Sequence, residues 1–325
     1  MTDDIRPLKV VALGGGHGLA ASLRALRPIT EDLTAVVCVS DDGGSSGRLR
    51  KQFPVVPPGD LRMALAALCG DDEWGATWAR VLQHRFESSG DLDGHALGNL
   101  LITALWQETG DVVAGLDWVA RLLGAQGRVL PVSLEPLEIF AQVQGADGSL
   151  RRVDGQVQVA TTHDEIVSIG LNPADPAACP QALEAVEGAD IVVLGPGSWF
   201  TSVLTHFQVP QMSQALHATS GKRVLVLNLN AQAGETSGYS PEHYLEVLAT
   251  SYPDFRLDWV IADPAHVQDE AALRRVSGTV GAQVFLAPVA DFAEFSDKHD
   301  IKALTSAFSY VFIEAGRING NDVSS

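Results

Sequence analysis

The chain has 325 residues, of which 46% are hydrophobic and 19% charged, and its 22 basic and 40 acidic side chains give a formal net charge of −18. This composition excludes a disordered chain and argues against nucleic acid or an anionic membrane as a general partner. A nucleotide ligand is still compatible with it, because a few local donors can bind one phosphate group.

The three cysteines, Cys38, Cys69 and Cys179, lie far apart and form no C-x-x-C motif. They predict neither a disulfide framework nor a cysteine-based zinc site, and they fit a reducing compartment. The chain begins Met1-Thr2-Asp3-Asp4, which is acidic where a signal peptide is basic, and no apolar run is long enough to span a membrane. We therefore expect a cytoplasmic protein with no membrane span.

The first forty residues predict the opening of a doubly wound sheet. Lys9–Leu13 is a short apolar run followed by glycines, Leu19–Leu26 has apolar residues at helical spacing, and Leu33–Val39 is a second strand. This order is typical of a Rossmann-like α/β protein with a mostly parallel sheet.

The middle of the chain changes character twice. Residues 57–124 predict a helical insertion, with helices at Asp60–Leu68, Trp74–Phe86, Leu97–Glu108 and Val112–Leu123. Residues 139–169 predict a small antiparallel β section, because short runs that include Val157 and Val159 are broken by Gly and Asp turn signals.

Strands and helices alternate again after this section. Strands are expected at Ile191–Leu194, Arg223–Leu229, Leu257–Ile261 and Gln283–Ala287, and helices near Gln181–Glu187, Ser202–Ala218, Pro241–Ala249 and Ile301–Val311. The length fits either two domains or one elaborated domain, and we expect a single elaborated α/β domain over residues 1–325.

A glycine-rich loop, Gly14–Gly18, joins the first strand to its helix. Glycines let the backbone approach a phosphate, and the helix N-terminus that follows offers free N–H donors. Gly16–Ala21 matches the dinucleotide pattern G-x-G-x-x-A, whereas the Lys-Ser/Thr of a Walker loop is missing. A turn needed only for strand-to-helix packing would look the same, but the context favours a bound ligand.

A second loop, Asp41–Arg50, follows the second strand, and ligands of open α/β sheets bind outside the carboxyl ends of strands. An acid there can read a ribose hydroxyl, and Arg48 and Arg50 can each donate two hydrogen bonds to a phosphate. Asp41 and Asp42 can alternatively hold Mg²⁺. A solvated flexible loop is the simpler interpretation, but acids and arginines together at a strand end favour a function.

Four further segments carry polar residues. Asp60 follows a Pro-Gly turn and is placed as a helix N-cap, and His95 and Asn99 open an apolar helix, where a buried structural histidine is the simpler interpretation. Gly195–Ser198 forms a second strand–glycine–helix turn that could bind an anion, and a polar loop begins at Asn228. Because several of these loops follow successive parallel strands, we expect them to converge on one edge of the sheet.

Together the motifs resemble the gluconeogenesis factor (YvcK-type) family of the 2-phospho-L-lactate transferase (CofD-like) superfamily. The matching segments, in chain order over nearly the whole sequence, are GGGHG at Gly14–Gly18, DDGGSSGRLR at Asp41–Arg50, PPGDLR at Pro57–Arg62, GHALGN at Gly94–Asn99, GPGSWFTS at Gly195–Ser202 and AQAGETSGYS at Ala231–Ser240. The resemblance implies a Rossmann-like fold with a helical insertion.

The resemblance also implies two functions. The first is a regulatory protein that binds a nucleotide sugar such as UDP-N-acetylglucosamine and links carbon metabolism to cell-wall synthesis and cell shape, with a cell-wall precursor enzyme as a candidate partner. The alternative is a Mg²⁺-dependent transferase that moves a phospholactyl-type group from a nucleotide diphosphate carrier to a deazaflavin hydroxyl. NAD could occupy the same cleft, although nothing else in the sequence indicates a hydride site. Whether the chain catalyses a reaction or forms a homo-oligomer is left open.

Site residues follow from the matched motifs, with no catalytic residue assigned. The phosphate cradle comprises Gly14, Gly15, Gly16, His17 and Gly18; the nucleotide loop comprises Asp42, Gly43, Gly44, Ser45, Ser46 and Arg48; the remaining lining comprises Asn99, Gly195, Gly197, Ser198, Asn228 and Lys298. Asp41 and Asp42 are metal ligands only in the transferase interpretation.

Three positions depart from the family pattern. His17 stands where the family often has Thr, which removes a small hydroxyl beside the phosphates. Lys298 stands where the family has Arg, so an anion contact there loses the planar guanidinium. Ile301 stands where some members have Thr, so this position offers no hydroxyl for phosphorylation.

Overall fold

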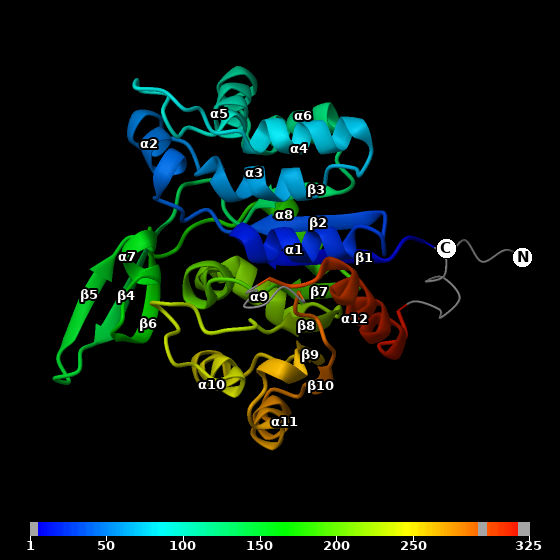
Figure 1. The fold of residues 1–325 in the computed structure, drawn as a ribbon. Coiled ribbons are helices and arrows are strands. Elements are labelled where there is room, and N and C mark those ends of the chain that lie inside the picture. The colour runs from blue at the N-terminus through cyan, green and yellow to red at the C-terminus, as the bar shows by residue number, and fades with distance from the viewer. Residues whose placement is uncertain (1–5, 292–297, 318–325) are drawn as a thin grey trace, which may run out of the picture.

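Seven parallel strands form the centre of the molecule in the computed structural model, which describes residues 6–291 and 298–317 (Figure 1). Their order is β10-β9-β8-β7-β1-β2-β3. The strands are β1 Lys9–Gly14, β2 Asp32–Val37, β3 Arg128–Pro131, β7 Ile191–Leu194, β8 Lys222–Val226, β9 Trp259–Ala262 and β10 Gln283–Leu286. The predicted doubly wound sheet is confirmed, and its direction of winding reverses between β1 and β7.

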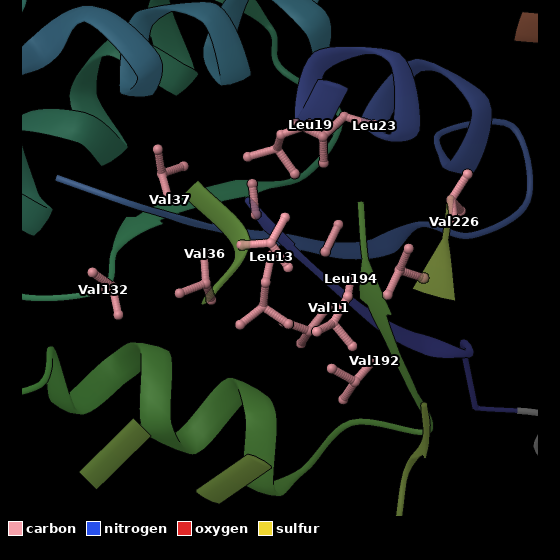
Figure 2. Close-up of a cluster of buried hydrophobic side chains, with 14 of the residues drawn as sticks. Val11, Leu13, Leu19, Leu23, Val36, Val37, Val132, Val192, Leu194 and Val226 are labelled. Atoms are coloured by element: carbon pink, nitrogen blue, oxygen red, sulfur yellow. The ribbon is translucent and has the colours of Figure 1, made fainter. Parts of the chain in front are cut away.

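Helices cover both faces of this sheet. On one face α1 (Gly16–Leu26) packs against α3 (Pro58–Ala67) and α12 (Ile301–Glu314), and on the other α8 (Pro180–Glu187) packs against α9 (Pro210–Ala218) (Figures 1 and 2). The predicted helical segment supplies α3 and an outer layer over it made of α4 Glu73–Gln83, α5 Leu97–Thr109 and α6 Val112–Leu123. The remaining long helices, α10 Pro241–Ser251 and α11 Glu270–Thr279, pack on each other.

No helix among residues 6–291 and 298–317 is both long and apolar enough to cross a membrane.

The core lies between the sheet and its two helical layers. Val11 and Leu13 of β1 and Val192 of β7 are almost fully buried, as are Leu19 and Leu23 of α1 above them (Figure 2). Because both faces of the central strands are covered, buried residues follow one another along each strand rather than alternating, as in Ile191–Leu194 of β7. Each such side chain stabilises the fold by roughly 1.5–3 kcal/mol.

A separate three-stranded antiparallel sheet, in the order β5-β4-β6, lies beside α2 (Gly44–Gln52) and α7 (Gln156–Ala160) (Figure 1). It comprises β4 Glu138–Gln144, β5 Leu150–Asp154 and β6 Glu165–Asn172. The predicted antiparallel section is therefore confirmed. The strand assignment of Val157 and Val159 is wrong, because both residues lie in α7, whose N-terminal amides bind a carboxylate from another segment.

Two other expectations about elements are wrong. Most of the segment predicted as a loop, Asp41–Arg50, is helical, because α2 spans Gly44–Gln52. The helix expected over Ser202–Ala218 is three elements, a π-helical turn at Trp199–Val203 (η1), a 3₁₀ turn at Leu204–Gln208 (η2), and α9. Proline explains the last break: Pro210 has no N–H to continue the preceding turn, but it suits the first position of a new helix.

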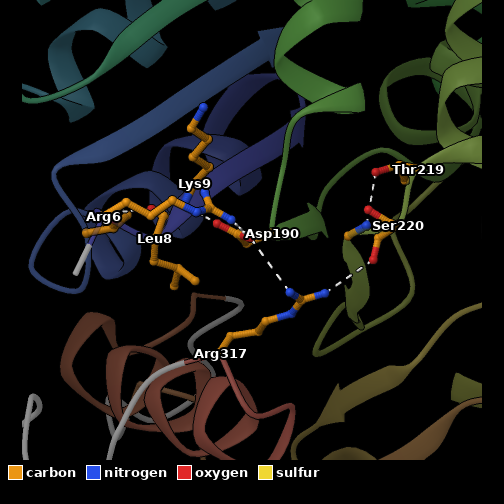
Figure 3. Close-up of polar contacts among 9 residues, drawn as sticks. Arg6, Leu8, Lys9, Asp190, Thr219, Ser220 and Arg317 are labelled. Atoms are coloured by element: carbon orange, nitrogen blue, oxygen red, sulfur yellow. Dashed lines mark hydrogen bonds and ion pairs between the residues drawn. The ribbon is translucent and has the colours of Figure 1, made fainter. Parts of the chain in front are cut away.

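The amino edge of the sheet is held by Asp190, just before β7 (Figure 3). Its carboxylate accepts hydrogen bonds from the Arg6 guanidinium at 2.7 Å and the Lys9 amide at 3.0 Å, and Arg317 lies 3.7 Å away. Burial opposes the charge, but these donors outweigh it, and the pKa of Asp190 is lowered. The first and last described segments are thus joined at the edge opposite the glycine-rich loops.

Candidate functional site

The loops that follow β1 and β7 are in direct contact at the carboxyl edge of the sheet. The Gly195 amide donates to the Leu13 carbonyl at 3.1 Å. A Cβ placed on Gly18 would lie 1.8 Å from the carbonyl oxygen of Pro196, so no larger residue fits there. The two glycine loops therefore converge at the point where the strand order reverses, which is where open α/β sheets bind ligands.

Asn228, two residues after β8, holds the second of these loops. Its side-chain oxygen accepts from the Gly197 amide at 2.7 Å, and its side-chain nitrogen donates to the Gly197 carbonyl at 2.8 Å. Gly197 has a φ of +127°, a conformation that favours glycine. The side-chain amide of Asn228 thus shapes this loop. The positive φ explains why position 197 is a glycine.

The two adjacent acids of the second predicted loop face different directions. Asp42 accepts from the amides of Gln156 and Val157, at 3.0 and 3.1 Å, and so stabilises the N-terminus of α7. Asp41 accepts from the Gly43 amide at 2.9 Å. Asp42 therefore connects the parallel sheet to the antiparallel sheet.

Three predicted residues are buried between α2 and its neighbours, namely Ser45 and Ser46 of α2 and Asn99 of α5. The Ser46 hydroxyl accepts from the Gly59 amide at 3.0 Å, which fixes α2 to the start of α3. The Asn99 side chain donates to Ser45 at 3.0 Å and accepts from Arg62 at 2.9 Å. These side chains hold the first turn of α2 in place and do not face solvent.

The two arginines of α2 line separate cavities. Arg48 donates to the carbonyl of Asp93 at 2.6 Å and lines a cavity of about 520 Å³ together with His95. Arg50 donates to the carbonyl of Asp41 at 3.3 Å and lines a cavity of about 470 Å³ against the antiparallel sheet. His17 is exposed at the start of α1, and Lys298 is exposed, with its carbonyl bonded to the Asp291 amide.

Asp60 lies at the first glycine loop, and the sequence interpretation missed this. The expected N-cap role is wrong, because α3 begins at Pro58 and its N-cap is Pro57. A Cβ on Gly15 would lie 2.5 Å from a carboxylate oxygen of Asp60. Burial raises the pKa of Asp60 to about 7, and the charge of Asp41 adds to this, while the Gly16 amide and Arg62 oppose it. A ligand phosphate here would meet an acid that a proton or a cation must neutralise.

A second buried acid, Glu235, lies at the loop after β7. Burial raises its pKa to about 7, against the opposing effect of the Thr201 hydroxyl and the amides of Thr201, Phe200 and Trp199. Those amides belong to the first turn of η1. The N-terminus that the sequence suggested for a ligand anion therefore faces a carboxylate of the chain itself.

A doubly wound sheet with glycine loops meeting beside its switch point defines the class of α/β proteins that bind ligands at strand carboxyl ends. Within that class, the sequence pattern of the family described as 2-phospho-L-lactate transferase CofD matches residues 10–301. The chain belongs to the CofD family.

Two named relatives and one solved structure show which members of the family this chain is similar to. The chain is 51% identical over 296 residues to the "Putative gluconeogenesis factor" of Mycobacterium tuberculosis (strain CDC 1551 / Oshkosh), covering 89% of this chain and 85% of that protein. It is 38% identical over 239 residues to the "Gluconeogenesis factor" of Halalkalibacterium halodurans, covering 74% and 72%. A crystal structure of a UPF0052-family protein from Bacillus halodurans superposes with a TM-score of 0.82 at 31% identity, covering 94% of this chain and 99% of the other.

Proposed function

We propose that the protein is a cytoplasmic regulatory protein of the gluconeogenesis-factor type that binds a nucleotide sugar resembling UDP-N-acetylglucosamine. In this role it links carbon metabolism to cell-wall synthesis and cell shape, through contact with a cell-wall precursor enzyme. The observation that carries the proposal is the contact between Gly18 and Pro196, which brings two glycine-rich loops together at the switch point.

The chemistry of these loops suits a diphosphate. Gly16, with a φ of +56°, begins α1, and the first amides of that helix are free of intrahelical partners and carry the positive end of its dipole. Arg48 donates to the carbonyls of Asp91 and Asp93, and Arg50 donates to that of Asp41, so among the described residues neither guanidinium is paired with a carboxylate. The N-terminus of α1 thus supplies donors at the glycine loops, and the two arginines supply positive charge beside α2; both favour binding without a metal.

The test is calorimetric titration of the full chain with UDP-N-acetylglucosamine, UDP, GDP and NAD, each with Mg²⁺ and with EDTA. We expect the uridine nucleotides to bind most tightly, with an affinity that EDTA leaves unchanged. A bound ligand also raises the melting temperature by mass action. If none of the four nucleotides binds at millimolar concentration, the proposal is wrong.

One observation favours the transferase alternative, which is that the charge of Asp41 helps to raise the pKa of Asp60 beside the glycine loop. Among the described residues no group of three or more His, Cys, Asp or Glu side chains is arranged to hold a metal ion. Two carboxylates nevertheless fit Mg²⁺, which commonly takes one or two of them and completes its shell with water and substrate phosphates. Mg²⁺-dependent release of a nucleoside monophosphate upon addition of a deazaflavin acceptor would establish this alternative and overturn the regulatory one.

A further inference from the structure

Four buried polar residues at the N-terminal turn of α2 form a continuous line of hydrogen bonds. They come from four segments: Arg62 from α3, Asn99 from α5, Ser45 from α2, and His95 from the turn before α5. All four are at most 4% exposed. Such a network is informative, because the donors and acceptors of each member limit those of the next.

We infer that Arg62 sets the direction of this hydrogen-bond relay, from Arg62 through Asn99 and Ser45 to His95, and that the relay fixes His95 as a neutral imidazole with its proton on Nε2. Arg62, Asn99 and Ser45 are then positioning residues that hold the N-terminal turn of α2. Their relevance to ligand binding rests on the proposed function, whereas the relay itself does not.

The first step concerns Arg62 and Asn99. A guanidinium has only donors, and its Nε lies 2.9 Å from Oδ1 of Asn99, with Nη1 bonded to the Gln83 side-chain oxygen. The oxygen of the Asn99 amide must therefore face Arg62. Its NH₂ group must then face the other way, toward Ser45.

The second step concerns Ser45 and His95. The Ser45 oxygen accepts from Nδ2 of Asn99 at 3.0 Å and from the Ala96 amide at 3.4 Å, so both of its lone pairs are used. Only its hydrogen remains, and Nδ1 of His95 lies 3.0 Å away. Nδ1 must accept that hydrogen, which leaves the ring proton on Nε2.

Protonation of His95 would break this arrangement, because a hydrogen on Nδ1 would face a hydroxyl with no free lone pair. Burial and the charge of Arg48 lower the pKa of His95 in the same direction. The other charged groups around His95 are Arg62 from α3, Arg85 after α4, whose guanidinium bonds the Gly94 carbonyl, and the acids of its own loop, Asp91 and Asp93.

The consequence for α2 is mechanical. Ser45 is the second residue of this helix, directly after Gly44, whose φ of +46° turns the chain into the site. The relay fixes that turn to α3 and α5, which pack on each other and on the rest of the helical layer. The geometry of the proposed nucleotide loop thus depends on a neutral His95.

The direct test is NMR of the full chain with ¹⁵N-labelled histidine, which reports both the tautomer and the pKa of His95. In the wild type we expect protonated Nε2, unprotonated Nδ1, and a pKa below the ordinary value of 6.5. In Asn99→Asp, Ser45 donates to the new carboxylate instead, so the proton of neutral His95 should move to Nδ1 and its pKa should rise. Ser45→Ala, which interrupts the relay, should also raise the pKa.

Ser46→Ala is the matched control. It removes a neighbouring buried hydroxyl that bonds the Gly59 amide and lies outside the relay, so the tautomer and pKa of His95 should remain as in the wild type. A wild-type His95 protonated on Nδ1, or an unchanged tautomer in Asn99→Asp, would overturn the inference.

A second measurement separates the relay from the proposed function. Affinity for UDP-N-acetylglucosamine should fall about tenfold in Ser45→Ala at pH 7.5, and in the wild type it should fall as His95 becomes protonated. Undiminished affinity in Ser45→Ala overturns the positioning role. Absence of nucleotide binding in the wild type overturns the proposed function, but it leaves the tautomer result intact.

Discussion

At the scale of single residues, Asp60 is the side chain whose environment departs furthest from the sequence expectation. A Pro-Gly-Asp turn before an apolar run is typical of a helix N-cap, and nothing in that pattern indicates that the carboxyl group lies against Gly15. Only tertiary packing creates this contact. The glycines of both loops were predictable, because two backbones can approach closely only where side chains are absent. Such places appear in the sequence as runs of glycine.

The raised pKa of Asp60 makes a prediction about stability. The folded protein holds this proton up to about pH 7, whereas the unfolded chain loses it near 3.8, so the protonated group stabilises the fold below pH 3.8 and that contribution is lost as the pH rises to 7. Asp60→Asn removes the titration. We expect it to be more stable than the wild type at pH 8 by on the order of 2 kcal/mol, and by less at pH 5.

Urea unfolding of both proteins at pH 5 and pH 8 measures this difference. A gain in stability that is the same at both pH values would mean that the Asp60 carboxyl is not buried as described. In the transferase alternative, the same variant would also lose any Mg²⁺-dependent turnover.

At the scale of elements, α2 shows why a sequence pattern alone does not predict every helix. Gly44-Ser45-Ser46-Gly47 has low helix propensity, and the loop interpretation follows from that composition. The helix forms because buried hydrogen bonds of Ser45 and Ser46 fix its first turn, and none of their partners is close in sequence. The same holds for α7, whose N-terminus depends on Asp42, more than a hundred residues earlier.

A single substitution at Gly18 can break the contact between the two glycine loops. In Gly18→Ala the new methyl group would overlap the Pro196 carbonyl, so the loops must separate. We expect a loss of about 1–3 kcal/mol in stability from this overpacking, and at least a tenfold loss in nucleotide affinity, which is about 1.4 kcal/mol or more. Denaturant unfolding and calorimetric titration measure the two effects.

Gly278→Ala is the control for this variant. Gly278 lies in α11, a Cβ there would meet nothing within 4 Å, and its φ is not in the positive region. Alanine is also the better helix former, so this change should leave affinity unchanged and stability equal or higher. Equal affinities for the two variants would remove the glycine loops from the binding site.

At the scale of the whole molecule, the alternation of strands and helices is visible in the sequence, because buried parallel strands are continuous apolar runs. The order of the strands within the sheet is not visible in the sequence. The strand β3 was missed, since four residues with one charged end give little signal, yet it completes one edge of the sheet beside β2. The joining of the first and last described segments through Asp190 likewise depends on pairs that are far apart in the chain.

In this arrangement the two edges of the sheet have different roles. Ion pairs tie the chain together at the amino edge, whereas the carboxyl edge collects the glycine loops, two buried acids with pKa values of about 7, and α2 with its arginines. The central claim is that a nucleotide diphosphate binds at the carboxyl edge, between the loops after β1 and β7.

The most direct test of this claim is a crystal structure of the protein with UDP-N-acetylglucosamine, grown in the presence of EDTA. We expect the diphosphate within hydrogen-bonding distance of the backbone amides of Gly15–Gly18 and adjacent to Pro196–Ser198. A nucleotide whose phosphates lie instead in either cavity beside α2, away from both glycine loops, would contradict it.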